Sequence, residues 1–142
     1  MAKIKRKINE LIIHCTATEY VFPVTVEDVR KWHLERGFND IGYHYLIDRQ
    51  GNIHVGRYLS IPGAHCKGHN QHSIGICYVG GLKDGLPTDT RSIPQKDALN
   101  KLIAELCDSY PITKISGHNE YSNKSCPCFY VDEYKRHIKQ LL

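Results

Sequence analysis

Three short apolar runs constrain the fold of this chain more than any other feature of its sequence. They are ELIIHC (10–15), SIGICYVGG (73–81) and ITKIS (112–116), and each contains β-branched residues and is bounded by turn or loop residues. Runs of this length and composition are typical of strands that are buried in a sheet. The three runs therefore predict the centre of the fold.

The segments beside these runs have the pattern of amphipathic helices. Thr25 is expected to be the N-cap of a helix with acidic residues in its first turn, and Gly37 is expected to stop it. A second helix is expected to begin near Pro94 and to end before Pro111, with its apolar residues on one face. Residues 131–142 have the pattern of a last helix, which closes the chain.

The remaining segments complete an α/β pattern. Residues 42–57 contain two short strand patterns around a turn at 49–52, which predicts a hairpin. Residues 57–72 and 118–128 are polar and lack a period, so they are expected to be loops. The order of elements predicts a single domain over residues 1–142, in which a central mixed β-sheet is flanked by helices. Residues that carry chemistry are expected at the ends of its strands.

Composition and charge argue against several classes of protein. The chain has 41% hydrophobic and 24% charged residues, which is ordinary for a globular protein, and its net charge of +4 is mild. The apolar run at residues 11–13 is far shorter than the core of about 7–15 residues in a signal peptide. No stretch approaches the roughly 18 apolar residues of a membrane helix. We therefore expect a protein that is made in the cytoplasm and has no membrane partner.

The six cysteines are expected to be thiols or metal ligands, because no signal peptide points to an oxidising compartment. Cys77 and Cys107 lie among apolar residues and are expected to be buried thiols. Cys126 and Cys128 differ, because they flank Pro127 in an irregular polar segment.

Two histidines and one of these cysteines could form a metal site. His14 ends the first strand, His118 follows the last strand, and Cys126 lies in a loop that can fold back toward both. Zinc binds imidazole nitrogen and thiolate sulfur at about 2.0–2.3 Å, and a catalytic zinc keeps three protein ligands. The spacing alone does not separate this interpretation from a hydrogen-bonded strand-end histidine and packed thiols. Cys128 is a competing thiol ligand.

Four motifs, taken together, resemble a known family. LIIHCTAT, GYHYLIDRQGNIHVGR, GAHCKGHNQHSIGICYVGG and ISGHNEYSNKSCPCF occur in this order from about residue 9 onward. They are similar to the zinc-dependent N-acetylmuramoyl-L-alanine amidases of the phage lysozyme type, whose fold peptidoglycan recognition proteins share. The resemblance implies an enzyme with Zn²⁺ as its cofactor, and we expect a monomer. Its substrate would be peptidoglycan, cut at the amide bond between the lactyl group of N-acetylmuramic acid and L-alanine.

The resemblance also implies roles for individual residues. The zinc ligands it implies are His14, His118 and Cys126. Lys124 matches the catalytic lysine, which would stabilise negative charge on the carbonyl oxygen. Tyr43 matches the active-site tyrosine, which would orient water or pass a proton. His65 falls in the substrate-side loop, and Glu120 is expected to be a surface residue because the family motif does not use it.

Two other functions remain as alternatives. The same fold could bind peptidoglycan without cutting it, although the presence of Cys126 favours catalysis. A small zinc-stabilised nucleic-acid binder could use CPC as a metal knuckle, but the positive charge is not gathered into a patch beyond KIKRK. We therefore expect no nucleic-acid partner.

The biological setting stays open at this point. A phage endolysin that acts on the cell wall after release, a prophage remnant, a secreted effector and a recycling enzyme all fit the sequence. His69 and His72 lie in the substrate-side loop, where they would either contact glycan or peptide or simply be solvated.

Overall fold

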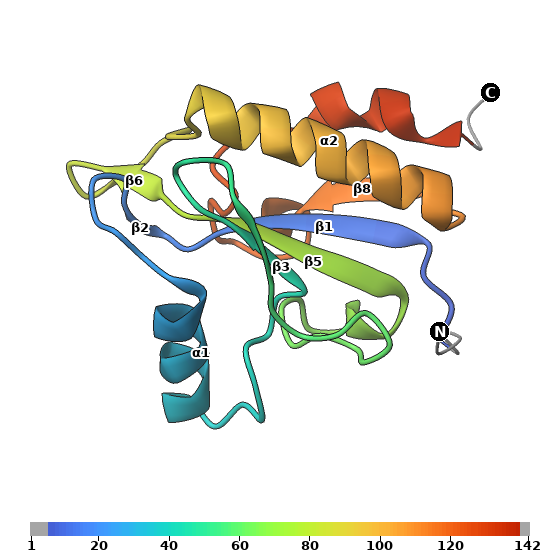
Figure 1. Cartoon of the computed structure of the whole chain (residues 1–142), viewed down its shortest axis with the longest axis horizontal. Helices are drawn as coiled ribbons and strands as arrows, with labels where there is room; N and C mark the ends of the chain where they lie inside the picture. The colour runs from blue at the N-terminus through green and yellow to red at the C-terminus, as the bar shows by residue number, and fades with distance from the viewer. Residues whose placement is uncertain (1–5, 140–142) are drawn as a thin grey trace.

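A five-stranded mixed sheet runs through the centre of the molecule (Figure 1). The structure is a computed structural model that describes residues 6–139. The strand order is β4-β3-β5-β1-β8. Strand β1 pairs in parallel with both β5 and β8, β3 pairs in parallel with β5, and β4 is antiparallel to β3. The strands are β1 (Glu10–Cys15), β3 (Tyr45–Ile47), β4 (Ile53–Val55), β5 (Ser73–Tyr78) and β8 (Lys114–Gly117).

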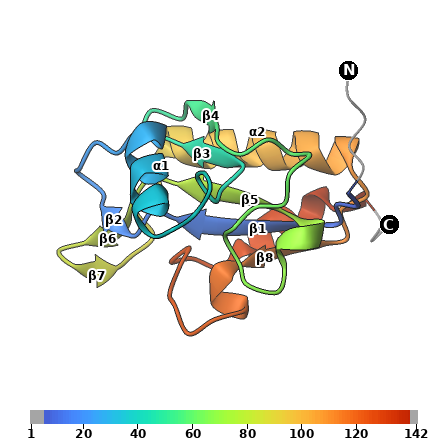
Figure 2. The ribbon, with the colours of Figure 1, turned by 90° about the horizontal axis from the view of Figure 1, so that it is seen from below.

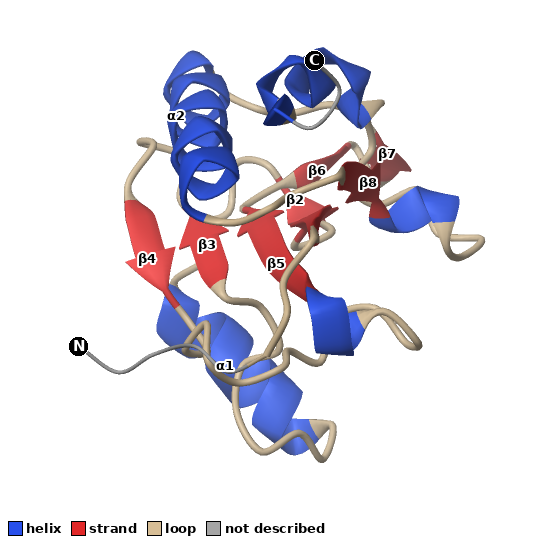
Figure 3. Ribbon diagram, turned by 90° about the vertical axis from the view of Figure 1, so that its right-hand side faces the viewer, coloured by secondary structure: helices blue, strands red, loops and turns tan. Residues whose placement is uncertain are grey.

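Helices cover both faces of this sheet, as the sequence pattern predicted (Figures 1 and 3). Helix α1 (Val26–Glu35) begins at a capping box formed by Thr25 and Asp28. Helix α2 (Ile93–Ser109) begins in the same way at Ser92 and crosses the opposite face of the sheet. Among residues 6–139, no helix is both long and apolar enough to span a membrane.

The last helix differs from its prediction. The structure forms a 3-10 helix, η3 (Val131–His137), beside α2, and residues 140–142 of the predicted helix lie outside the described residues. Val131 and Tyr134 are buried in this helix and extend the core between α2 and the sheet. The apolar pattern was therefore right about the buried face and wrong about the type of helix.

A small second sheet was not predicted (Figure 2). Its strands are β2 (Thr18–Glu19), β6 (Gly81–Lys83) and β7 (Leu86–Pro87), in the order β2-β6-β7. The predicted strand over 73–81 ends at Tyr78, because Gly80 and Gly81 take positive φ angles of 133° and 105° that redirect the chain into β6.

Alternation along β1 separates the two faces of the central sheet. Leu11 and Ile13 point toward α2 and join the main core, in which Leu99 and Ile103 are fully buried. Burying one such aliphatic side chain contributes about 1.5–3 kcal/mol. Glu10, His14 and the buried Ile12 lie on the opposite face, which we call the polar face because it carries the buried polar side chains of this strand. They lie beside Ser73, Gly75 and Ser116 of the neighbouring strands.

Candidate active site

Two histidines meet at the carboxyl ends of adjacent parallel strands. Ile13 of β1 is in register with Gly117 of β8, so the next residues, His14 and His118, lie side by side. Their ring centroids are 4.7 Å apart. His14 is buried and His118 is half-buried. The parallel pairing of β1 and β8 therefore creates the core of the site.

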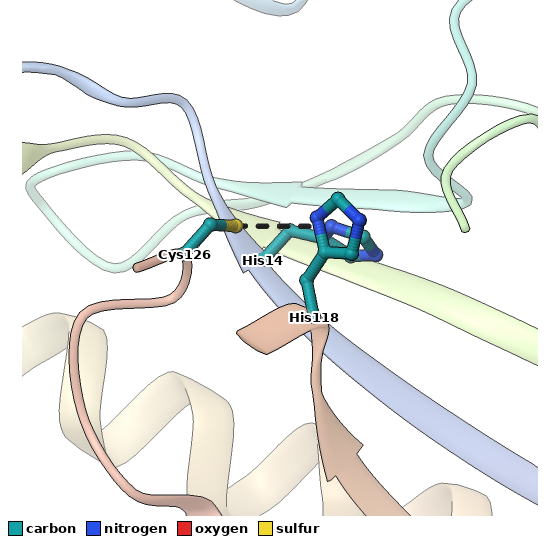
Figure 4. A group of neighbouring side chains, drawn as sticks. All are labelled: His14, His118 and Cys126. Carbon is teal, nitrogen blue, oxygen red and sulfur yellow. Dashed lines mark hydrogen bonds between the residues drawn. The ribbon is translucent and has the colours of Figure 1, made fainter. Parts of the chain in front are cut away.

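The loop after β8 brings Cys126 back to these histidines (Figure 4). The Tyr78 hydroxyl donates a hydrogen bond to the Pro127 carbonyl oxygen at 2.6 Å, which anchors the loop to β5. The backbone N–H of Cys15 donates to the Cys126 sulfur at 3.1 Å. A Cβ atom at Gly117 would lie 2.9 Å from Cδ of Pro127, so the close approach of this loop to β8 requires glycine there.

The three side chains have the spacing of a metal site. One donor atom from each of His14, His118 and Cys126 lies within 4.8 Å of the others. Nδ1 of His14 is 3.8 Å from Sγ of Cys126. Two ligands of a tetrahedral zinc, one nitrogen and one sulfur, would be about 3.6 Å apart, so the observed spacing fits zinc. The sulfur of Cys128 is directed elsewhere, to a contact of 3.9 Å with the Cys15 sulfur.

The protonation states also suit metal binding. Burial, and then the neighbouring His65 and His118, lower the pKa of His14 well below its ordinary value, which favours neutral imidazole. The hydrogen bond from the Cys15 thiol is the main cause that lowers the pKa of Cys126, which favours thiolate. Neutral imidazole and thiolate are the forms of these side chains that bind metals.

His65 contacts the second nitrogen of His14. Nε2 of His14 lies 2.8 Å from Nδ1 of His65, and Nε2 of His65 lies 3.2 Å from the Ser73 hydroxyl. With a metal ion on Nδ1 of His14, the Nε2–H of His14 would donate to Nδ1 of His65. Gly75 makes room for this ring, since a Cβ atom there would lie 2.6 Å from it.

A cavity of about 360 Å³ lies beside this cluster and is partly lined by His65 and His118. Tyr43 and Lys124 line the same cavity, and the Tyr43 ring lies 5.1 Å from the His14 ring between centroids. Tyr43 precedes β3, which begins at Tyr45, so it lies outside the strand in which the sequence pattern placed it. The structure thus brings four of the six residues singled out from the sequence to the lining of one cavity, and the other two, His14 and Cys126, to the cluster beside it.

One wall of the cavity was not predicted. His33 on α1, with Arg36 and Phe38 after it, forms this wall. Burial, and then the charge of Arg36, lower the pKa of His33 to about 4. No local motif indicated this wall, because it depends on how α1 packs.

Glu120 is exposed, as expected of a surface residue, and it has a structural contact. Its carboxylate accepts a hydrogen bond from the Gly117 N–H at 2.7 Å, which holds the turn that follows β8. The carboxylate is thus engaged by the backbone next to His118.

This architecture, an α/β domain with a potential metal-ligand cluster of two histidines and a cysteine beside a cavity, is typical of a small enzyme. Residues 4–129 match the family described as N-acetylmuramoyl-L-alanine amidase. The endolysin of Enterobacteria phage K11 is 37% identical over 134 residues, which cover 91% of this chain and 89% of that protein.

Two solved structures are similar over most of their length. The amidase LysC from Clostridium intestinale has a TM-score of 0.80 at 24% identity, covering 98% of this chain and 88% of LysC, and supports the fold alone. Wild-type Drosophila PGRP-LB has a TM-score of 0.73 at 29% identity, covering 99% of this chain and 82% of that protein. The chain belongs to the N-acetylmuramoyl-L-alanine amidase family. It is an amidase that hydrolyses an amide bond of peptidoglycan.

Proposed function

We propose that this amidase depends on zinc, which His14, His118 and Cys126 hold. The observation that carries the proposal is the convergence of these three donors beside the cavity that His118, Tyr43 and Lys124 line. The family is generally zinc-dependent, which agrees with this donor set. Zinc in this set would polarise a carbonyl group and acidify water.

Lys124 stabilises the negative charge that develops on the substrate carbonyl oxygen. Its side chain lines the cavity, and its charge acts on both His118 and Cys126. A cation that is more strongly engaged by the developing oxyanion than by the neutral amide lowers the barrier. Lys124 is therefore the residue whose loss should reduce the rate without emptying the metal cluster.

Tyr43 and His65 have different roles in this proposal. The phenol of Tyr43 lies beside His14 at the cavity, where its O–H can donate a hydrogen bond that orients the attacking water or the amide. His65 is a positioning residue, because its hydrogen bond to Nε2 fixes the orientation of His14. It also lines the cavity and so lies where a substrate would contact it.

We infer that the enzyme cuts the bond between the lactyl group of N-acetylmuramic acid and L-alanine, and acts as an endolysin on the cell wall after release. The similarity to phage endolysins along nearly the whole length of both chains supports this setting.

An end-group assay on purified peptidoglycan tests the proposal. Wild type should release new N-terminal alanine without new reducing sugar ends, and a chelator should abolish this release. Lys124→Ala should lower kcat by about 10²–10³ while it still binds zinc. Lys96→Ala, which changes an exposed lysine of α2, is the matched control and should retain full activity. No alanine release by folded, zinc-loaded wild type would contradict the proposed bond, and full activity of Lys124→Ala would remove Lys124 from the mechanism.

A further inference from the structure

A second cluster of potential metal ligands lies at the other end of β1. One donor atom from each of Glu10, His69 and His72 lies within 4.8 Å of the others. Glu10 opens β1, and the two histidines flank or end the short 3-10 helix η1 (Asn70–His72). Glu10 and His14 lie four residues apart on the polar face, so the two clusters occupy opposite ends of one strand.

Glu10 is a buried carboxylate with an organised environment. It is 3% exposed. Its Oε2 atom accepts hydrogen bonds from the Ser116 hydroxyl at 2.6 Å and the Tyr121 hydroxyl at 2.5 Å. Its Oε1 atom lies 3.0 Å from Nε2 of His72. One carboxylate oxygen is thus held by hydroxyl groups, while the other faces the histidines.

His69 carries an unpaired polar atom at this cluster. Its ring stacks on Tyr121 with centroids 3.8 Å apart, which fixes the ring plane. Its Nδ1 atom is buried and has no hydrogen-bond partner within residues 6–139. A buried nitrogen without a partner destabilises the folded state, so this atom, beside a buried carboxylate, indicates a missing ligand.

We propose that Glu10, His69 and His72 form a second metal site, which takes a divalent transition metal, with Zn²⁺ the best fit. We assign Oε1 of Glu10, Nδ1 of His69 and Nε2 of His72 as the ligands. The oxygen and nitrogen ligands of a tetrahedral zinc would be about 3.4 Å apart, close to the 3.0 Å between Glu10 and His72. Two imidazoles and a carboxylate suit zinc, whereas Ca²⁺ and Mg²⁺ prefer oxygen ligands throughout.

Such an ion would stabilise one wall of the active-site cavity. It would tie the loop that carries His69 and His72 to β1, and residues of this loop from Ala64 to Asn70 line the cavity. The Ser73 hydroxyl donates to the His69 carbonyl oxygen at 2.7 Å and also contacts His65, which contacts His14. The second site would therefore help to hold Ser73 and His65, and through them the orientation of His14. The inference uses a separate set of ligands and does not depend on the proposed function.

Titration of the metal-free full chain with Co²⁺ distinguishes the two sites. A cobalt–thiolate bond gives a charge-transfer absorption band, and of the two proposed sites only the one that contains Cys126 has a thiolate ligand. Wild type should bind two equivalents of Co²⁺. Cys126→Ser should lose the charge-transfer band and still bind one ion at the second site. His69→Phe, which preserves the stacking on Tyr121, should bind one ion and retain the band.

Two further variants provide an alternative substitution at the second site and a matched control. His72→Gln should also bind one ion, which keeps the test valid if His69→Phe fails to fold. His54→Phe is the matched control, because His54 forms a pair with Asp48 at 2.8 Å, and neither residue belongs to a cluster of three potential ligands within residues 6–139. This control should bind two equivalents, as wild type does.

Thermal unfolding gives a second readout that does not require activity. In the Cys126→Ser background, zinc at about 100 times the Kd of the second site should raise Tm by about 5–10 °C. Adding His69→Phe to that background should abolish the increase. A single equivalent of Co²⁺ in wild type, with the full thiolate band, would overturn the proposal, as would unchanged stoichiometry in folded His69→Phe and His72→Gln.

Discussion

The two faces of the central sheet differ sharply although the same strands build them. Leu11 and Ile13 of β1 enter the apolar core under α2, whereas Glu10 and His14 of the same strand enter polar clusters. Alternation of side chains places both sets in a single six-residue strand. The α2 face therefore mainly determines stability, and the polar face determines chemistry. Changes on the two faces should separate these properties.

The largest loss of activity is expected on the polar face, from Cys126→Ser. This change removes the only thiolate of the proposed zinc set, so amidase activity on peptidoglycan should fall to background. Cys128→Ser is the matched control, because its sulfur contacts Cys15 rather than the histidines, and should preserve activity. Alanine release and bound zinc should be measured for both variants. Loss of activity and zinc in Cys128→Ser, with both retained in Cys126→Ser, would make Cys128 the ligand.

A large loss of stability, without a loss of kcat, is expected on the α2 face from Leu99→Ala. Leu99 is fully buried in the main core, so this change should lower the free energy of unfolding by about 2–5 kcal/mol. The kcat of the folded fraction should stay at the wild-type value, because α2 covers the face opposite His14. Urea unfolding and kcat at low temperature test this separation. A large fall in kcat of the folded protein would show that the two faces are coupled.

The sequence predicted the elements whose signals are local. β-branched runs predicted the buried strands, an N-cap residue predicted α1, and an amphipathic pattern between two prolines predicted α2. The position of His14 and His118 at strand ends, together with the family motifs, pointed to the cluster that includes Cys126. The small sheet of β2, β6 and β7 was missed, because strands of two or three residues carry almost no periodic signal.

Other parts of the polar face could not be predicted, because they depend on tertiary contacts. Glu10 and His72 are 62 positions apart, and only the parallel pairing of β1 with β5 brings them together. The contact of His65 with His14 likewise depends on this pairing and on the space left by Gly75. A loop histidine in the sequence looks the same whether it is solvated, bound to metal or bonded to a ligand residue.

The polar face should also make stability depend on pH through His44. This side chain is fully buried, accepts a hydrogen bond from the Gly75 N–H and contacts the Ile61 carbonyl oxygen. Burial lowers the pKa of His44 to about 4, the charges of Arg6 and Arg57 act in the same direction, and the Ile61 contact opposes the shift. The ring of His65 lies 6.0 Å away between centroids.

The sign follows from proton uptake. Between pH 6.5 and about 4, the unfolded chain protonates His44 and the folded chain does not. The free energy of unfolding should therefore fall as the pH falls through this window, by at most about 3 kcal/mol from this residue. Urea unfolding at several pH values should show a flatter dependence for His44→Gln than for wild type. His54→Gln, at a half-buried surface pair, is the control, and an equally flat curve for it would argue against a specific role of His44.

The smallest effect is expected from substitution of His65. Zinc affinity and KM of these variants show whether His65 orients the ligand His14 or contacts the substrate. If His65 mainly orients His14, His65→Phe should weaken zinc binding about 10–100-fold, because the outer hydrogen bond of a ligand histidine is lost. Gly75→Ala should weaken it in the same direction, since its Cβ would displace the His65 ring. His65→Asn, which retains a hydrogen-bonding side chain, should recover part of the affinity. Zinc affinity measured by competition with a chelator tests all three variants. Unchanged zinc affinity with a raised KM would instead assign His65 to substrate binding, as its place in the family motif first indicated. His65 lies between the two clusters of potential metal ligands, so the polar face would then contact the substrate directly through this side chain.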